Sequence, residues 1–587
     1  MRYEDTAERD GFRFKLWRGE RMAMLGFDVD APEDDFVGFA LEVRSPGSDR
    51  FVELRNRMAF EYATGAGADV TGDRQFPTSE APIQKFRWVH FPWMPQDGEY
   101  RYRATKMHMP RDGELVRGTR IELGIDLSHE THEGFLDVGF TRNFASSQAY
   151  REQFGNNAGI IPRDAKDGLD FAKLDLKNDR GESVYDWLGF EAKALIYDFL
   201  DKAAEDKNVT IDALAYDLNE PGVVERLERL GSRLRIVIDD SSSRDDDGEP
   251  NGHDLPDSCE SRSAGRFEAS GAQVRRTHFH NLQHHKVFVQ RGKDGAPEKV
   301  LCGSTNFTFR GLYIQSNNVL VFTSQEVATL FGTMFDAAFG DPRGFRGTDF
   351  AKTWHVAATA GKPTIKLCFS PHSDTDLSLN PIAAAIDQAT SSALYSVAFL
   401  SQMRSGPTLA AFERLMDRPI FSCGTVDRRG GLELVKPDGS VGLVDFRFLG
   451  SKAPEPFRSE WSGGKGRNVH HKFVVTDFNL PTAKVFTGSS NFSPSGENKN
   501  GDHLIMIEDR GVAIAYAIEA MRVFDHLQFR NRMDTAFGPD GKRLATAKAP
   551  RSLALRKPTA ISGKASWFER FYEAGTQIER DRKLFSR

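Results

Sequence analysis

The sequence predicts an α/β protein in which two related α/β halves follow an antiparallel β-sandwich. Three observations support this prediction. Short segments of alternating apolar and polar residues fill residues 12 to about 145, as expected for half-buried strands. Helical and strand patterns alternate after about residue 180, which is typical of α/β layers. The alternation begins again after about residue 361, which indicates a large repeat whose copies pack about a pseudo-twofold axis.

The N-terminal region, residues 1–150, predicts the sandwich. Its strand-like segments are separated by turn-forming clusters such as APEDD, and this punctuation favours an antiparallel sandwich. No catalytic constellation stands out there, so we interpret the region as an accessory packing or targeting domain. The predicted strands are 12–17, 23–30, 37–45, 85–93, 100–109 and 120–127.

The rest of the chain divides into two halves and a tail. The first half, 151–360, predicts a helix over 183–206, a strand, a second helix ending near Gly231 and another strand. The second half, 361–545, repeats helix, strand, helix and strand over 380–426. Residues 546–587 are basic, and we interpret them as a C-terminal tail on the solvated surface.

An acidic, turn-rich segment runs from Asp239 to about Gly265. We expect a long exposed loop, and loops of this kind often line a functional site. Asp217 and Glu220 lie where a turn enters the next helix. Carboxylates are favoured at that position, so we expect both to act locally.

Composition excludes several classes. The 587 residues are too many for one core, and a net charge of −6 is unusual for a protein that mainly grips nucleic acid. Four widely spaced cysteines suggest neither disulfides nor zinc, but buried thiols. No signal peptide or membrane span is evident. We expect a cytoplasmic protein, with export by another route and peripheral membrane contact left open.

One motif occurs twice. The first copy is HHKVFVQR from His284, followed by GSTNF from Gly303. The second copy is HHKFVVTD from His470, followed by GSSNF from Gly488. The copies are 186 residues apart at the histidine and 185 at the glycine. A whole strand–turn–strand unit therefore repeats.

The spacing has a physical meaning. Side chains alternate faces along a strand, so His284 and Lys286 should point the same way, as should His470 and Lys472. Two facing units would bring two imidazoles, two ammonium groups and two amides together. That set suits a phosphodiester, because Lys and Asn bind its oxygens while the histidines attack phosphorus and protonate the leaving group. The lysines supply positive charge, so we expect no cofactor and no metal.

These motifs resemble those of the phospholipase D superfamily, HxKx4D followed by GSxN and present twice. The resemblance covers residues 180 to 540 and implies two phospholipase D-like units. It implies that His284 and His470 are nucleophile and acid/base, with His284 favoured as the nucleophile. It also implies phosphate-binding roles for Lys286, Lys472, Asn306 and Asn491, with Ser304 and Ser489 beside them.

The sequence departs from the family pattern in the first copy. Arg291 replaces the motif aspartate, which Asp477 retains in the second copy. We interpret that aspartate as structural, so the change is tolerable. The family often has an acidic residue eleven positions after the asparagine, which orients a catalytic histidine. Asp502 stands there in the second copy and Asn317 in the first.

The resemblance implies a metal-independent phosphodiesterase with a phosphohistidine intermediate. We expect phospholipid head-group esters as substrates, with hydrolysis or transfer to another alcohol. The alternative is a nuclease acting on DNA or RNA, supported by the basic stretch GGKGRNVHHK. A third reading is a fold that binds phosphodiesters without cleaving them. Oligomeric state stays open.

Overall fold

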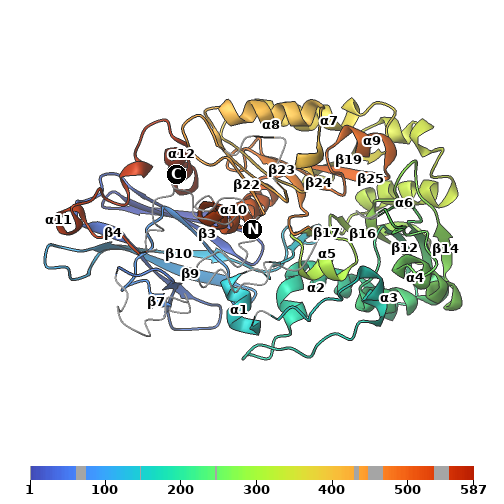
Figure 1. Cartoon of the computed structure of the whole chain (residues 1–587), viewed down its shortest axis with the longest axis horizontal. Helices are drawn as coiled ribbons and strands as arrows, with labels where there is room; N and C mark the ends of the chain where they lie inside the picture. The colour runs from blue at the N-terminus through green and yellow to red at the C-terminus, as the bar shows by residue number, and fades with distance from the viewer. Residues whose placement is uncertain are drawn as a thin grey trace.

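The computed structural model of the chain describes residues 2–60, 75–143, 145, 147–155, 157–244, 248–428, 432, 435–446, 467–534 and 554–587. Side chains of residues 148 and 529–534 are outside this description. The N-terminal strands form one end of the molecule and the two α/β halves form the other (Figure 1). Within these residues, no helix combines the length and apolar character needed to cross a bilayer.

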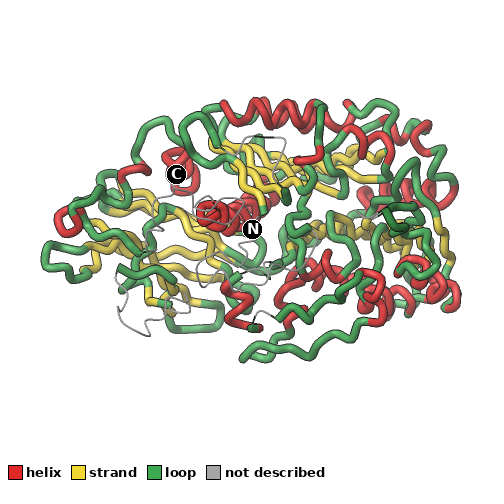
Figure 2. The backbone as a smooth tube through the Cα atoms, in the orientation of Figure 1, coloured by secondary structure: helices red, strands yellow, loops and turns green. Residues whose placement is uncertain are grey.

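Two four-stranded antiparallel sheets confirm the predicted β-sandwich (Figure 2). Alternate residues of each strand face the core, where the rings of Phe27 and Phe39 stack with centroids 4.4 Å apart. The first sheet has the order β1 (Glu4–Arg9), β2 (Phe12–Arg18), β3 (Ala23–Val29), β8 (Arg87–His90). The second has the order β10 (Val116–Asp126), β9 (Glu99–His108), β4 (Phe36–Arg44), β5 (Val52–Glu53).

The first α/β half is built on a seven-stranded mixed sheet. Its order is β11 (Leu136–Phe140), β17 (Asn318–Phe322), β16 (Pro297–Gly303), β15 (Lys286–Arg291), β12 (Thr210–Ala215), β13 (Leu234–Ile238), β14 (Gln273–Arg276). Helix α2 (Val184–Glu205) covers one face and α6 (Gln325–Gly340) the other. Helix α3 (Pro221–Glu228) packs beside α2, and α5 (Phe309–Tyr313) follows β16.

The second half repeats this plan on an eight-stranded sheet. Its order is β18 (His355–Ala357), β19 (Thr364–Ser370), β25 (Asp502–Glu508), β24 (Lys484–Gly488), β23 (Lys472–Thr476), β20 (Ser392–Val397), β21 (Phe421–Val426), β22 (Leu443–Asp445). Helices α7 (Asp376–Gln388) and α8 (Pro407–Asp417) cover one face, and α10 (Arg510–Asp534) covers the other. Six consecutive strands therefore match between the sheets, from β17-to-β14 and from β25-to-β22. The α/β repeat is confirmed.

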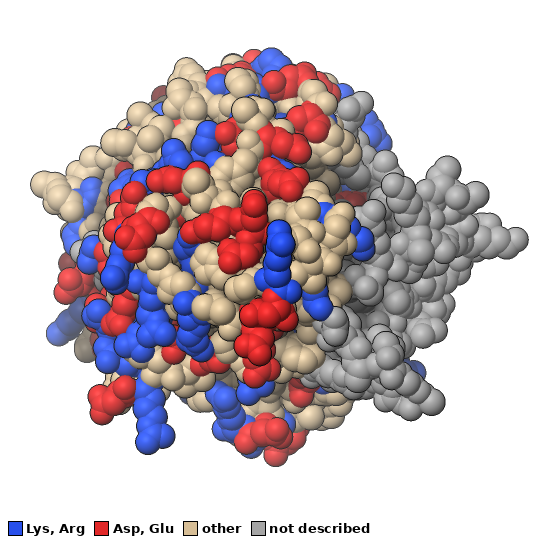
Figure 3. All heavy atoms as spheres, turned by 90° about the vertical axis from the view of Figure 1, so that its left-hand side faces the viewer, with Lys and Arg blue, Asp and Glu red and all other residues tan. Residues whose placement is uncertain are grey.

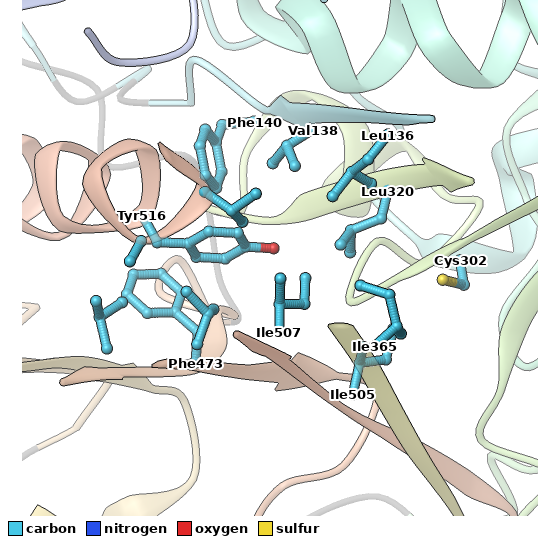
Figure 4. Close-up of a cluster of buried hydrophobic side chains, with 14 of the residues drawn as sticks. Leu136, Val138, Phe140, Cys302, Leu320, Ile365, Phe473, Ile505, Ile507 and Tyr516 are labelled. Carbon is cyan, nitrogen blue, oxygen red and sulfur yellow. The ribbon is translucent and has the colours of Figure 1, made fainter. Parts of the chain in front are cut away.

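The two sheets share one hydrophobic core. Residues of β11 and β17 face residues of β23, β25 and α10 across it (Figure 4). The polar edge of the same interface carries isolated bridges from Gln283 to Gly501 and from Ser316 to Val469. The segments beside the two motifs therefore meet where the halves join.

The C-terminal residues differ from the solvated tail that their composition suggested. Trp567 and Phe571 are buried in the sandwich core. Phe585, in helix α12 (Gln577–Ser586), is fully buried, and its carbonyl accepts a hydrogen bond from Trp17 Nε1 at 2.8 Å. Figure 1 shows this helix beside β3. Basic composition concealed the apolar face, because the apolar residues are widely spaced along the segment.

The loop expected from Asp239 to Gly265 is shorter than predicted. Helix α4 (Cys259–Ala269) begins inside it, with Ser258 as the N-cap that accepts from the Ser261 backbone N–H. The polar residues that suggested a loop are in part this cap and the first turn of the helix, where such residues are favoured. All four cysteines are buried free thiols, as expected.

Candidate functional site

The two motif histidines lie immediately before the matching strands β15 and β23. Backbone contacts with the other half hold each one: His284 N–H donates to the Gly501 carbonyl at 2.9 Å, and His470 N–H to the Ser316 carbonyl at 3.2 Å. A pocket of about 580 Å³ opens here. It is lined by both histidines and by Asn306 and Asn491, and also by Tyr216, Asp217, Gln315, Phe399, Arg467 and Lys499.

Each histidine is oriented by the opposite half. His284 Nδ1 lies 2.7 Å from Asp502 Oδ1, and His470 Nδ1 lies 2.8 Å from Asn317 Oδ1. Asp502 and Asn317 are buried, with exposed fractions of 1% and 0%. The residue eleven positions after each asparagine therefore pairs with the histidine of the other half. The His284–Asp502 pair carries one more negative charge than the His470–Asn317 pair.

These partners determine where the ring protons lie. The carboxylate of Asp502 only accepts, so His284 Nδ1 carries a proton and Nε2 is left free. The amide of Asn317 donates to the Gly311 carbonyl at 2.9 Å, which turns its oxygen toward His470. His470 Nδ1 therefore also carries a proton, so in both neutral rings the lone pair is on Nε2.

The two motif lysines are buried beside their histidines. Lys472 Nζ lies 3.2 Å from His470 Nε2, and its ammonium faces the ring of Phe399 at 5.6 Å. Lys286 donates to the His284 carbonyl, and its ammonium faces the ring of Tyr216 at 4.8 Å. An aromatic ring thus forms one wall for each lysine.

The electrostatics of this centre follow from burial and like charges. Burial and the charge of Lys286 lower the pKa of His284, against the effect of Asp502. Burial and Lys472 lower the pKa of His470 well below its usual value. Burial lowers the pKa of Lys286 to about 7, and burial with the Lys286 charge lowers the pKa of Lys472 well below its usual value. A crowded cationic site of this kind favours an anionic ligand.

The serines of the two GSxN units lie behind the histidines. Ser304 Oγ donates to Asn317 Oδ1 at 2.9 Å, and Ser489 Oγ lies 3.2 Å from His503 Nδ1. The preceding glycines have φ of 144° and 137°, and a Cβ on Gly488 would lie 2.3 Å from the His503 carbonyl oxygen. Only glycine fits this close approach.

The aspartate position of the HxKx4D motif is remote from the pocket. Asp477 accepts backbone N–H groups of Thr390, Ser391 and Ser392 at 2.7–3.1 Å, which fixes the turn that enters β20. Arg291, at the matching place, forms ion pairs with Asp212 and Asp336. Both residues stabilise the far end of a strand.

The second histidine of each HH pair points away from the pocket. His471 Nε2 lies 2.9 Å from Glu519 Oε1, and His285 stacks on His503 with centroids 5.5 Å apart. These contacts lie in the interface between the halves. The alternation of side chains along the strands explains the difference from His284 and His470.

Sequence reasoning missed part of the site. Glu220 caps helix α3 as expected, accepting from the Val223 backbone N–H at 2.8 Å. Asp217 was expected to act locally too, but its Oδ2 accepts from Asn306 Nδ2 at 2.5 Å, and its Oδ1 lies 2.9 Å from His253 Nε2. His253 belongs to the segment expected to line a site, and its position among acidic residues was the available signal.

A second cavity of about 990 Å³ adjoins the first. Asp217, Asn306 and Gln315 line both. Asp217, His253 and Glu260 offer ligand atoms within 4.8 Å of one another, the spacing that a metal ion would need. Both ring nitrogens of His253 are engaged by carboxylates, however, and an engaged nitrogen is not free to ligate.

One protein family matches part of the chain. The family described as "Cardiolipin synthase, PLD-like domain" matches residues 200–339. No curated protein matches the sequence. Among solved structures, polyphosphate kinase from Porphyromonas gingivalis is 14% identical, with 62% of this chain and 50% of that chain covered and a TM-score of 0.38. The chain thus covers half of that kinase.

Two further solved structures are similar. Phosphatidylserine synthase from Haemophilus influenzae Rd KW20 is 13% identical, covering 59% of this chain and 84% of that chain, with a TM-score of 0.39. Nuc from Salmonella typhimurium, a phospholipase D family member, is 21% identical, covering 26% and 90%, with a TM-score of 0.20. Residues 200–339 thus match a PLD-like domain, and the doubled motif lies on matching strands of the two sheets.

Proposed function

We propose that the protein is a phosphodiesterase that works through a phosphohistidine intermediate on His284. One observation carries this proposal: two buried histidines line one pocket, and each has a partner from the opposite half. In both neutral rings the lone pair is on Nε2, which serves attack on phosphorus in His284 and proton transfer in His470. Two imidazoles in one anion-favouring pocket suit a double displacement at phosphorus.

The unequal partners support the assignment of roles. Attack by His284 Nε2 breaks the bond from phosphorus to the leaving oxygen and leaves a positively charged phosphoimidazole ring. The Asp502 carboxylate stabilises that charge. His470 has a neutral amide partner, so its protonated ring is the stronger acid and gives its Nε2 proton to the leaving oxygen. Water, deprotonated by His470, then attacks phosphorus and releases His284.

The remaining polar groups bind the phosphate. Lys286 and Lys472 place two ammonium groups beside the rings, where they offset negative charge on the non-bridging oxygens. Asn306 and Asn491 offer amide N–H donors from matching positions in the pocket lining. These residues supply the charge that a metal would otherwise bring, so we propose a metal-independent reaction.

We propose phospholipid head-group esters as the substrates, cleaved by hydrolysis or transferred to another alcohol. The description of the matched family, which names cardiolipin synthase, supports a lipid substrate. The described surface at the sandwich end mixes acidic and basic side chains (Figure 3), so that face offers no uniform basic groove. Nucleic acid is the second candidate, because Arg467 and Lys499 line the catalytic pocket.

A paired assay with chelator present tests the proposal. One arm follows head-group release from mixed phospholipid vesicles, and the other follows fragments of single- and double-stranded DNA and RNA. We expect activity in the lipid arm, with a loss of at least about 1,000-fold in His284→Ala and His470→Ala. Mass spectrometry after an alkaline quench should find the adduct on His284.

The control is His129→Ala, which removes an exposed histidine 3.0 Å from Asp97 in the sandwich. It should retain full activity. Nucleic-acid cleavage with the same histidine dependence would replace the lipid substrate by nucleic acid. An adduct on His470 would reverse the roles of the two rings, and activity that survives both site substitutions would overturn the proposal.

A further inference from the structure

A chain of hydrogen bonds connects the phosphate-binding Asn306 to the residue before His284. Asn306 Nδ2 donates to Asp217 Oδ2 at 2.5 Å, and Asp217 Oδ1 lies 2.9 Å from His253 Nε2. His253 Nδ1 lies 2.8 Å from Asp239 Oδ2. Asp239 Oδ1 accepts from the Gln283 backbone N–H at 2.6 Å. These hydrogen bonds therefore link Asn306 on one side of the catalytic pocket to the backbone before His284 on the other.

His253 is the cation of this chain. Burial lowers its pKa, but hydrogen bonds to Asp217 and Asp239 outweigh that effect and raise the pKa to about 11. Glu260 adds a further negative charge nearby. On the other side, the Arg276 guanidinium donates to the His253 backbone carbonyl. With both ring nitrogens bonded to carboxylates, His253 offsets the charge that Asp217 places beside a phosphate.

The second half has a different device at the matching place. Asp427, which follows β21, accepts the Val469 backbone N–H at 3.1 Å, as Asp239 does for Gln283. Its cationic partner is Arg467 at 3.3 Å, whose guanidinium lies 4.2 Å from the ring of Phe399. Tyr216 takes the place of that ring, with centroids 4.9 Å from His253 and 4.7 Å from His284.

Within the described ranges, only in the first half does this hydrogen-bond network reach the motif asparagine. Among the described residues, no hydrogen bond partner is found for the Asn491 carboxamide, whereas Asn306 is held by Asp217. A carboxylate only accepts hydrogen bonds, so Asp217 orients the Asn306 amide with its nitrogen toward the carboxylate. One N–H is then bonded and the second is free for a phosphate oxygen. Asn306 is thus preorganised and Asn491 is not.

We propose that Asp217 and His253 are a positioning pair for this site. They hold Asn306 in its phosphate-binding orientation and, through Asp239, fix the backbone just before His284. This inference rests on the proposed function. Neither residue touches the reacting atoms in this role. The pair makes the two phosphate-binding amides unequal, so that the first half binds the phosphate in a fixed orientation.

The test measures binding of inorganic phosphate by calorimetry, and hydrolysis of bis(4-nitrophenyl) phosphate, in the full-length protein. We expect His253→Gln to weaken phosphate binding by about 10- to 100-fold, the effect of losing a charge-assisted hydrogen bond. His253→Arg copies the cation of the second half and should stay within about threefold of the wild type. His129→Gln is the matched control and should change nothing.

The decisive comparison uses an Asn306→Ala background. Because the pair acts through Asn306, His253→Gln should change phosphate binding there by less than about twofold. An equal loss in both backgrounds would overturn the inference, since His253 would then act on phosphate directly. If His253→Gln does not fold, as judged by its melting curve, Asp217→Ala provides the same comparison, because Asp217 is the member of the pair that contacts Asn306.

Two further outcomes separate the alternatives. If chelator alone weakens phosphate binding to wild-type protein as much as His253→Gln does, Asp217, His253 and Glu260 hold a metal ion and the inference fails. If wild-type protein binds phosphate but cleaves no phosphodiester, the proposed function fails while the binding comparison still decides the role of the pair.

Discussion

At the residue scale, the buried lysines make the site sensitive to pH. Burial lowers the pKa of Lys286 to about 7, although the negative charges of Asp502, Asp217 and Asp239 partly oppose this. Lys286 therefore loses its proton as pH rises through neutrality. A bound phosphate diester is an anion and favours the charged form, so binding and protonation are coupled.

We therefore expect kcat/KM to fall as pH rises above about 7, because the free protein loses the ammonium that we propose binds phosphate. Lys286→Arg keeps its charge at high pH, so it should move this alkaline limb upward by at least about one pH unit, even if its geometry lowers the maximal rate. The pH dependence of kcat/KM from pH 5 to 10 measures the limb. An unchanged limb in Lys286→Arg would assign it to another group.

At the element scale, the two GSxN turns depend on glycine. Gly488 ends β24 with a φ of 137°, and the missing Cβ leaves room for the His503 carbonyl of β25. Ser489 and Asn491 follow directly, so the turn sets where these side chains lie. The strand pair and the Asn491 amide are thus coupled through one backbone position.

Gly488→Ala should destabilise the protein by about 2–4 kcal/mol, because it combines an unfavourable φ with a clash against a backbone carbonyl. Activity should fall as well, since Asn491 must shift. Gly265→Ala is the control: this glycine lies in helix α4 with open space around it, and alanine there should be neutral or stabilising. Urea unfolding measures both. Equal stability of the two variants would contradict the role assigned to Gly488.

At the scale of the whole molecule, the C-terminus joins the sandwich to the second half. Phe585 stacks on Phe478 with centroids 5.4 Å apart and meets Phe421 edge-on at 5.7 Å. Arg587 Nε lies 2.8 Å from Asp28 Oδ2 of β3. We propose that residues 554–587 be assigned to the N-terminal domain rather than to a separate tail, with the two α/β halves as the other domains.

Phe585→Ala should cost about 3–5 kcal/mol of stability, the usual range for removing a fully buried phenyl ring. The loss should appear as a lower unfolding midpoint, with the catalytic residues untouched. Val356→Ala, at a side chain 60% exposed, serves as the control and should change stability by less than about 0.5 kcal/mol. If the C-terminal residues lay only on the surface, the two variants would have equal stability.

The sequence by itself determined the features that depend on local periodicity. Two-residue alternation identified the sandwich strands, and the same rule separated His284 from His285 on opposite strand faces. The repeat spacing identified the two halves. These predictions succeed because side-chain direction along a strand follows from backbone geometry alone, whatever lies nearby. The candidate residues came from the same short motifs.

Only the tertiary structure decided which groups meet across the chain. Asp502 orients His284 of the other half, His253 joins Asp217 to Asp239, and Phe585 returns to the sandwich at the start of the chain. Each contact joins segments whose distance along the sequence is set by packing of whole sheets and helices. No local pattern specifies such a pairing, because the free energy that selects it comes from burying the interface as a unit.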